Sequence, residues 1–227
     1  MFERVGKVMR ARPTEIIERV VKKIAPGRAP SFREAHVIKA LIVIDDLGCI
    51  GRARLSKILN LTEGETRTLL KHLKNENLIS TSKRGARLTK KGENLLKDLR
   101  QRIGDYVSVP RSSLTVGPSN VAILLKDAAS AIRYGLEQFY EALKVGAMGA
   151  TTLVFTRGEL RIPGTGERVV EFDKEACEKL IEIFKPKEGD VIVICSGDDR
   201  ETAELGVLSI AFQILKYISS EGRPSSG

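Results

Sequence analysis

The side chains best suited to chemistry are cationic, and they form two groups close together in the sequence. A guanidinium such as that of Arg67 can pair bidentately with guanine, whereas Lys ammonium groups suit phosphates. Thr68 can contact a thymine methyl or a phosphate. The residues expected to contact DNA lie on a predicted helix and on the hairpin after it: Arg67, Thr68, Lys71, Lys74, Lys83, Arg84, Arg87 and Lys90.

The helix that carries the first group has a defined start signal. Thr62-Glu63-Gly64-Glu65 has the pattern of a capping box, in which the Thr62 hydroxyl accepts from the amide of Glu65 and the carboxylate reaches back. We therefore assign Glu65 to the cap before any contact with DNA. The helix is predicted to run to about Asn77, with an inner stripe of Leu69, Leu70 and Leu73.

The second group lies on a predicted hairpin. Residues 79–82 and 86–89 are short β-prone pieces, and between them Lys83-Arg84-Gly85 forms a tip in which glycine can take a positive φ. Thr89 is expected to cap a last helix over residues 90–103. Lys-rich tips are also common on solvated hairpins, so the hairpin indicates DNA contact only together with the helix beside it.

Three further helices are predicted earlier in the chain. They cover residues 14–25, with Thr14 as N-cap, residues 34–47, ended by Gly48, and residues 52–60. The first has an apolar face of Ile and Val that includes Ile24. This face has two interpretations, since it can complete the domain core or pair two subunits.

The predicted elements follow one another as helix, short strand, helix, turn, helix, two-stranded wing and helix. Within them the chain has the pattern Gly51-Arg52-x-x-Leu55-Ser56-x-x-Leu59-x-Leu61-Thr62-Glu63-Gly64-x-x-Arg67-Thr68-Leu69-Leu70-x-x-Leu73-x-x-x-x-Leu78-Ile79. Over residues 34–103 this order and pattern resemble the winged helix-turn-helix family, and the arrangement is similar to archaeal regulators in which such a domain precedes an uncharacterised α/β effector-like domain. The resemblance implies that the second helix of the motif enters the major groove and that the wing lies along the backbone or in the adjacent minor groove.

The charge is divided unevenly along the 227 residues. The chain has a net charge of +9, but residues 1–104 carry 24 Lys+Arg against 11 Asp+Glu, and residues 105–227 carry 14 against 18. A half of charge +13 joined to a half of −4 indicates a polyanion-binding module attached to a second domain. RNA stays an alternative, although Phe2 and Phe32 are the only aromatic residues of the basic half and stacking platforms are missing.

The second half alternates strands and helices. Strands are predicted at 121–125, 152–155, 159–162 and 191–195, and helices at 128–145, 173–185 and 200–218. This is the β-α-β-β-α-β order of a ferredoxin-like domain with one extra helix, which is apolar beyond one stripe and is expected in a subunit interface or between domains. The predicted fold is α+β with two domains: winged helix 1–104, linker 105–119, ferredoxin-like domain 120–221 and disordered tail 222–227.

Two loops of the second half are candidates for a small-molecule site. The glycine-rich stretch 146–152 can bring backbone amides close to a ligand, and Ser196-Gly197-Asp198-Asp199 follows a buried strand. The alternatives are structural, with Gly146 as a helix C-cap and one aspartate as the cap of the last helix. The candidate ligand-binding residues are Gly146, Gly149, Thr151, Thr152, Ser196, Asp198 and Asp199.

These features predict a cytoplasmic DNA-binding transcription regulator that binds double-stranded DNA as a homodimer and responds to a small-molecule effector. The second half has no His and no catalytic constellation, so neither enzyme activity, metal nor cofactor is expected; the three scattered cysteines favour a reducing cytoplasm. No apolar run is long enough to cross a membrane. Only eight Asn and Gln residues favour a thermophile. The alternatives are an enzyme or a protein-interaction module whose site lies in the second half and whose winged helix serves for docking.

Overall fold

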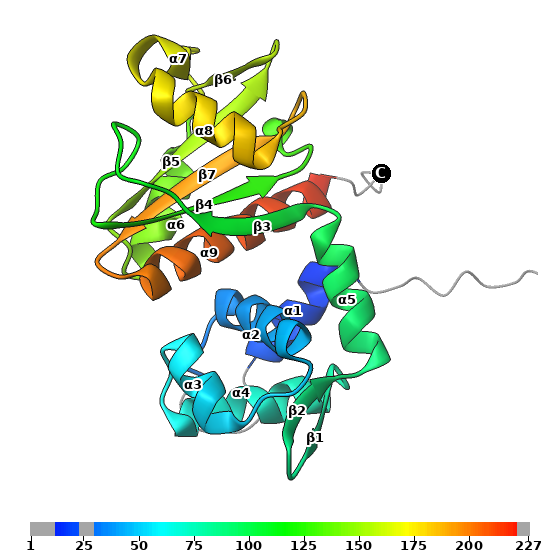
Figure 1. The fold of residues 1–227 in the computed structure, drawn as a ribbon. Coiled ribbons are helices and arrows are strands. Elements are labelled where there is room, and N and C mark those ends of the chain that lie inside the picture. The colour runs from blue at the N-terminus through cyan, green and yellow to red at the C-terminus, as the bar shows by residue number, and fades with distance from the viewer. Residues whose placement is uncertain (1–11, 23–29, 222–227) are drawn as a thin grey trace, which may run out of the picture.

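The computed structural model describes residues 12–22 and 30–221, which form a small helical domain and a larger domain built on a sheet (Figure 1). The helical domain contains the first seven elements of the chain. They are α1 (Pro13–Val21), α2 (Glu34–Leu47), α3 (Arg52–Leu59), α4 (Glu63–Asn75), β1 (Ile79–Ser82), β2 (Gly85–Leu88) and α5 (Lys90–Arg100).

Helix α1 belongs to the core of the helical domain. It buries Ile16, Ile17 and Val20 in the same apolar cluster as α2 and α4, so its face is not left for a second subunit. The predicted cap is wrong, because the helix begins at Pro13 and Thr14 is buried inside the first turn. Ile24, the last residue of the predicted apolar face, lies outside the described residues.

The boundary between α5 and the next segment differs from the prediction. Helix α5 ends at Arg100, and Ile103–Ser108 forms strand β3, which pairs antiparallel with β4 (Ser119–Leu125). The expected helix over 90–103 is therefore too long, and the expected linker 105–119 begins inside a strand. The difference has a non-local cause, because β3 forms through its pairing with β4. Residues 104–119 taken alone are rich in Pro, Gly and Ser, which is typical of a linker.

The second domain has a five-stranded sheet in the order β3-β4-β7-β5-β6, in which every neighbouring pair is antiparallel. The remaining strands are β5 (Gly149–Thr156), β6 (Glu159–Arg161) and β7 (Val191–Gly197). The helices are a 3₁₀ turn η1 (Ala129–Ala131), α6 (Leu136–Lys144), α7 (Val169–Phe172), α8 (Lys174–Phe184) and α9 (Arg200–Glu221).

The α+β class, the two domains and the succession β4, α6, β5, β6, α8, β7, α9 agree with the prediction. The strand order differs from the ferredoxin-like one, in which the first and third strands of the unit are the central pair. Here β7, the last strand, lies between β4 and β5, and β3 occupies the outer edge of β4. All seven residues of β7 are buried, which requires a central position with both faces covered.

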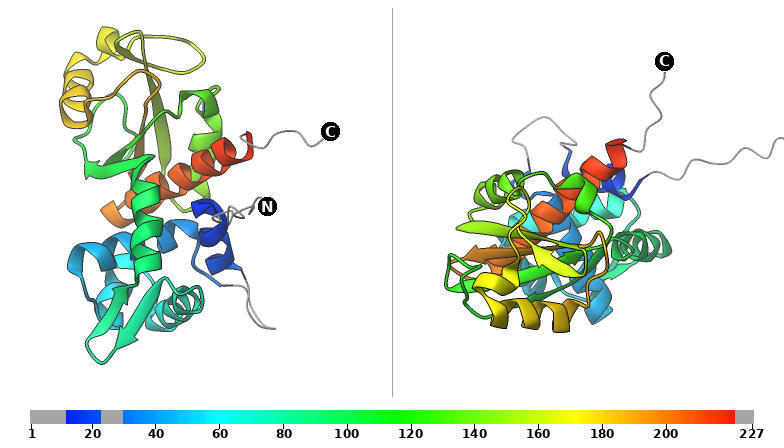
Figure 2. Two further views of the ribbon diagram at one scale, coloured as in Figure 1. Left: turned by 90° about the vertical axis from the view of Figure 1, so that its right-hand side faces the viewer. Right: turned by 90° about the horizontal axis from the view of Figure 1, so that it is seen from above.

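The two faces of the sheet have different covers. Val121, Ile123 and Val193 face α9 and share its apolar cluster, whereas Ala122 and Ile194 belong to a second cluster under α8. Helix α9 lies between the sheet and α2, as Figures 1 and 2 show, so that one apolar cluster runs through both domains. The strongly apolar last helix is thus buried between domains, which was one of its two predicted positions.

A buried ion pair joins the domains at this contact. Lys39 Nζ of α2 lies 2.8 Å from Glu204 Oε2 of α9, and the Lys39 side chain is only 2% exposed. Among the helices in the described part of the chain, none is long and apolar enough to span a membrane.

Candidate nucleic-acid interface

Helices α3 and α4 form the helix-turn-helix. Helix α3 ends at Asn60, which takes the left-handed conformation at φ 52°, and the chain then turns into the capping box of α4. An ion pair between Arg52 and Glu63, 3.0 Å apart, connects the starts of the two helices. The turn is therefore fixed at both of its ends.

The capping box forms as the sequence predicts. The amide of Glu65 donates to Thr62 Oγ1 at 3.2 Å, and the amide of Thr62 donates to Glu65 Oε2 at 2.8 Å. Hydrogen bonds from the side chain of Ser31 and from the Thr62 backbone lower the pKa of the Glu65 carboxyl. Glu65 is thus an ionised cap at the positive end of the helix.

Three cations lie on the outer face of α4. Arg67, Lys71 and Lys74 are exposed and follow one another at i, i+4 and i+7, which places them on one stripe. Within residues 12–22 and 30–221, none of the three has an acidic partner, in contrast to Arg52. Thr68 is exposed, but its hydroxyl donates to the Gly64 carbonyl at 3.1 Å, so its methyl is the part left for contact.

The wing is a two-stranded hairpin held against the helices by a single-residue bridge. Strands β1 and β2 pair from Ile79↔Leu88 to Ser82↔Gly85, and Ile50 forms a bridge to Ala86 through hydrogen bonds of 3.1 and 2.9 Å. Gly85 has φ +134°, and a Cβ there would overlap the Ile50 carbonyl. A glycine is required because the wing and the backbone of Ile50 approach so closely.

The cations of the wing differ in whether they already form an ion pair. Lys83, Arg84 and Arg87 are exposed and have no acidic partner among the described residues. Lys90, at the start of α5, pairs with Glu93 at 3.1 Å. In Figure 1 the hairpin and α4 lie at the end of the molecule away from the five-stranded sheet, so the predicted residues gather on the same end.

Helix α3 adds two cations that were not among the predicted residues. Arg54 and Lys57 are exposed and have no acidic partner in the part of the chain that the structure describes. In a helix-turn-helix the first helix crosses the DNA backbone, so exposed cations there suit phosphates. The signal was present in the sequence, since Arg52, Arg54 and Lys57 fall within eight helical residues.

The predicted ligand residues of the second domain lie together at one end of the sheet. Gly149 of β5 stands opposite Ser196 of β7, and Asp198 and Asp199 follow that strand. Asp199 caps α9 by accepting from the Thr202 amide at 2.7 Å. Hydrogen bonds from the Thr202 side chain and then from its amide lower the pKa of the Asp199 carboxyl.

The other polar groups of this cluster are used within the fold. Ser196 Oγ donates to Asn120 Oδ1 at 2.7 Å, and Thr151 Oγ1 donates to the Leu114 carbonyl at 2.8 Å. Gly146 follows α6 at φ +86° and its amide donates to the Leu143 carbonyl at 3.1 Å, as a helix end requires. Thr152 Oγ1 is buried and has no hydrogen-bond partner among the described residues.

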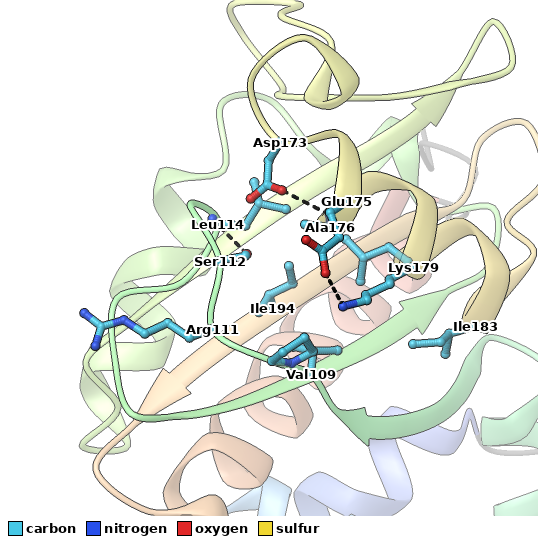
Figure 3. Close-up of a pocket in the computed structure, with 12 residues that line it drawn as sticks. Val109, Arg111, Ser112, Leu114, Asp173, Glu175, Ala176, Lys179, Ile183 and Ile194 are labelled. Carbon is cyan, nitrogen blue, oxygen red and sulfur yellow. Dashed lines mark hydrogen bonds and ion pairs between the residues drawn. The ribbon is translucent and has the colours of Figure 1, made fainter.

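A cavity of about 180 Å³ lies elsewhere, between residues 109–114 and α8 (Figure 3). Its lining is partly apolar, with Leu114, Leu180 and Ile194, and none of the seven predicted ligand residues lines it. Lys179 pairs with Glu175 at 2.6 Å at its edge, and Figure 3 shows the Arg111 side chain directed away from the other lining residues. No cluster of three His, Cys, Asp or Glu side chains that could hold a metal occurs among the described residues.

A helix-turn-helix followed by a bridged wing defines the first domain as a winged helix. Residues 37–103 match a family described as the CggR N-terminal DNA binding domain, and residues 116–214 match a Domain of unknown function (DUF4443). The chain thus joins an N-terminal DNA-binding domain to a C-terminal α+β domain of uncharacterised role.

One solved structure has the same fold over most of both chains. It is a hypothetical protein from Pyrococcus horikoshii OT3, with 23% sequence identity and a TM-score of 0.66 over 82% of this chain and 94% of the other. No curated protein is significantly similar to this chain in sequence.

Proposed function

We propose that this protein is a transcription regulator that reads double-stranded DNA through α4 and the β1–β2 wing. The observation that carries the proposal is the set of exposed cations without acidic partners on these two elements: Arg67, Lys71, Lys74, Lys83, Arg84 and Arg87. Arg67 lies in the first half of α4, where a recognition helix meets base edges, and the lysines suit phosphates. The match to a DNA-binding family over residues 37–103 supports this assignment.

The proposal extends to two copies on one DNA site. A single winged helix covers a short stretch of DNA, whereas two-fold proteins read two half-sites at a fixed spacing. The second domain would then hold the copies together. Its helix α9 packs on both the sheet and α2, so the position of the second domain also sets the position of the winged helix.

Regulation by a small molecule is the third part of the proposal. The cavity beneath α8 is a better candidate for the ligand site than the predicted residues at the end of the sheet. Most polar groups at that end already form hydrogen bonds within the chain. Metabolite screens by thermal shift and calorimetry test this part. It is abandoned when no compound binds and DNA affinity never responds.

The experiment for DNA binding measures the affinity of the full chain for genomic fragments at several salt concentrations. The logarithm of affinity should fall linearly with the logarithm of salt concentration, by about 0.9 per phosphate contact. Arg67→Ala should cost about 1–3 kcal/mol and relax one base position, and Arg84→Ala should weaken binding to all sequences.

Lys187→Ala is the matched control, since it removes one positive charge from an exposed position of the second domain outside the cavity. Absent or salt-insensitive binding contradicts the proposal. So does an equal loss of affinity in Lys187→Ala, because the effect would then reflect net charge rather than the α4 surface.

A further inference from the structure

We infer that the outer face of α6 is the surface through which two copies of this chain associate. Leu136, Tyr140 and Leu143 lie on one stripe of the helix and are 58%, 59% and 43% exposed. Single exposed apolar residues are normal, but three in a row on one helix face mark an interaction surface. The inference rests on the proposed function, because it names the contact that would join the two DNA-binding copies.

The stripe continues into neighbouring apolar side chains. Phe139 contacts Tyr140 edge to face, with ring centroids 5.8 Å apart. Phe139 and Val116 both border Gly149, where an added Cβ would lie 2.8 and 3.2 Å from them, and the Met148 sulfur borders Gly117 in the same way. Val116 and Met148 are themselves exposed, so the surface, which we call the α6 patch, extends beyond the helix.

The opposite face of α6 packs within the chain. Gln138 and Ala142 are buried, and Glu141 accepts a hydrogen bond from Ser209 of α9 at 2.7 Å. Helix α6 therefore cannot rotate to bury the patch, which can lose its contact with water only against another molecule.

Charge makes a second copy the best occupant. Glu137 lies in the first turn of α6 and Lys144 follows in the last. The Lys144 side chain already pairs with Glu141 of its own helix at 2.9 Å, but it is 60% exposed and can also meet a carboxylate from outside. When two α6 helices pack antiparallel about a two-fold axis at Tyr140, Glu137 of each copy comes level with Lys144 of the partner subunit. The helix is thus complementary to itself, as a two-fold interface requires.

The position of the patch fits the same arrangement. Helix α6 packs on β5 and beside α9, whereas α4 and the wing lie at the end of the molecule away from the sheet (Figure 1). Pairing through α6 leaves the DNA-binding elements of both copies uncovered.

The test measures the mass of the full chain by sedimentation equilibrium across a range of concentrations, without DNA. Wild-type protein should dimerise. Tyr140→Asp, which sets like charges face to face at the axis, should weaken dimerisation by at least about 30-fold. Phe172→Asp is the matched control, because Phe172 is an exposed aromatic residue of α7 outside the patch and its substitution should leave the dimer intact.

A charge exchange tests the register. Glu137→Lys and Lys144→Glu should each weaken the homodimer, and a mixture of the two variants should associate more tightly than either alone, because opposite charges then meet at both ends. A melting temperature close to that of the wild type shows that each variant is folded.

A wild-type chain that stays monomeric overturns the inference, as does a dimer that resists Tyr140→Asp. Monomers that bind lipid vesicles through the patch would assign it to a membrane and also overturn it. Since the measurement contains no DNA, these outcomes are distinct from a failure of DNA binding.

Discussion

The ion pair between Lys39 and Glu204 should be the most sensitive single contact between the two domains. Its atoms are 2.8 Å apart, and the side chains are 2% and 10% exposed. Glu204 also accepts from Arg200 Nε at 2.7 Å through its other oxygen. Lys39 has no second ion-pair partner among the described residues. Loss of Glu204 would therefore leave Lys39 without a counterion, whereas loss of Lys39 would leave Glu204 paired with Arg200.

Removing one partner leaves a buried charge without its counterion, which typically costs about 3–5 kcal/mol. Lys39→Met should fall at the lower end, about 3 kcal/mol, because Arg200 still neutralises Glu204. Glu204→Gln should cost more, since the ammonium of Lys39 then has no acidic partner. For a chain of this size, 3 kcal/mol corresponds to a decrease of about 6–12 °C in melting temperature.

The double variant Lys39→Met with Glu204→Leu separates the charge effect from the packing. It removes both ions and fills the space with apolar side chains, which is often neutral or stabilising. Urea denaturation of the wild type, Lys39→Met, Glu204→Leu and the double variant closes the cycle. Because each single variant should cost about 3 kcal/mol or more and the double variant close to nothing, the coupling energy should approach the sum of the single costs, about 6 kcal/mol.

An exposed pair provides the control. Arg52 and Glu63 are 41% and 55% exposed, so Arg52→Met should cost less than about 1 kcal/mol. The reasoning is refuted when Lys39→Met costs no more than Arg52→Met, or when the double variant is as unstable as the sum of the single variants.

Two further predictions concern the helical domain. Burial lowers the pKa of His36 from 6.5 to about 4. Below pH 6.5 the unfolded chain therefore gains a proton that the folded chain does not, so the free energy of unfolding should fall by up to about 3 kcal/mol as the pH decreases toward 4, whereas His36 should cause no change above pH 6.5. His36→Gln should remove this loss, and an unchanged pH profile of urea denaturation in the variant would contradict the assignment. Gly85→Ala should lower the free energy of unfolding by more than about 2 kcal/mol, because the added Cβ separates the wing from Ile50. Gly48 is the control: it has φ +64° but no atom within 4 Å of an added Cβ, so Gly48→Ala should cost only about 1–2 kcal/mol. Equal costs at both sites would show that the close approach to Ile50 is unimportant.

The winged helix could be predicted well because its signals are local. The capping box links Thr62 and Glu65 three residues apart, and the stripe of Arg67, Lys71 and Lys74 follows from helical spacing alone. The fate of α1 needed the structure, since only the packing of Ile17 and Val20 against other helices shows that its apolar face is internal.

The sheet could be predicted only in part, because strand order depends on contacts between distant residues. The seven apolar residues of β7 indicate a strand buried on both faces, but not which strands lie beside it. Strand β3 was missed because it is short and begins a segment, residues 104–119, that is rich in Pro, Gly and Ser, while its identity comes from Tyr106↔Ile123 and the neighbouring pairs with β4. Strand β7 is central because it pairs with both β4 and β5.

Predicting the candidate sites had a similar limit, because residue type does not show which polar groups are already satisfied. Lys90 already forms an ion pair with Glu93, and the Thr68 hydroxyl already donates a hydrogen bond to the Gly64 carbonyl. Asp199, a candidate ligand by its place after a buried strand, is a helix cap. Free and engaged side chains of the same type differ only in what the folded chain brings beside them.

The uneven charge of the chain determines which end of the molecule approaches DNA. The basic half leads the encounter with DNA, because phosphates attract the +13 half and repel the −4 half. That orientation points the second domain, with α6, away from the duplex (Figure 1). Residues 101–102 connect α5 directly to β3, and α9 packs on both α2 and the sheet. In the proposed dimer, a change in how the two second domains meet would therefore be carried to α4 without a long linker. A regulator built in this way would adjust the spacing of its recognition helices by rotating whole subunits rather than by moving one domain of a subunit against the other.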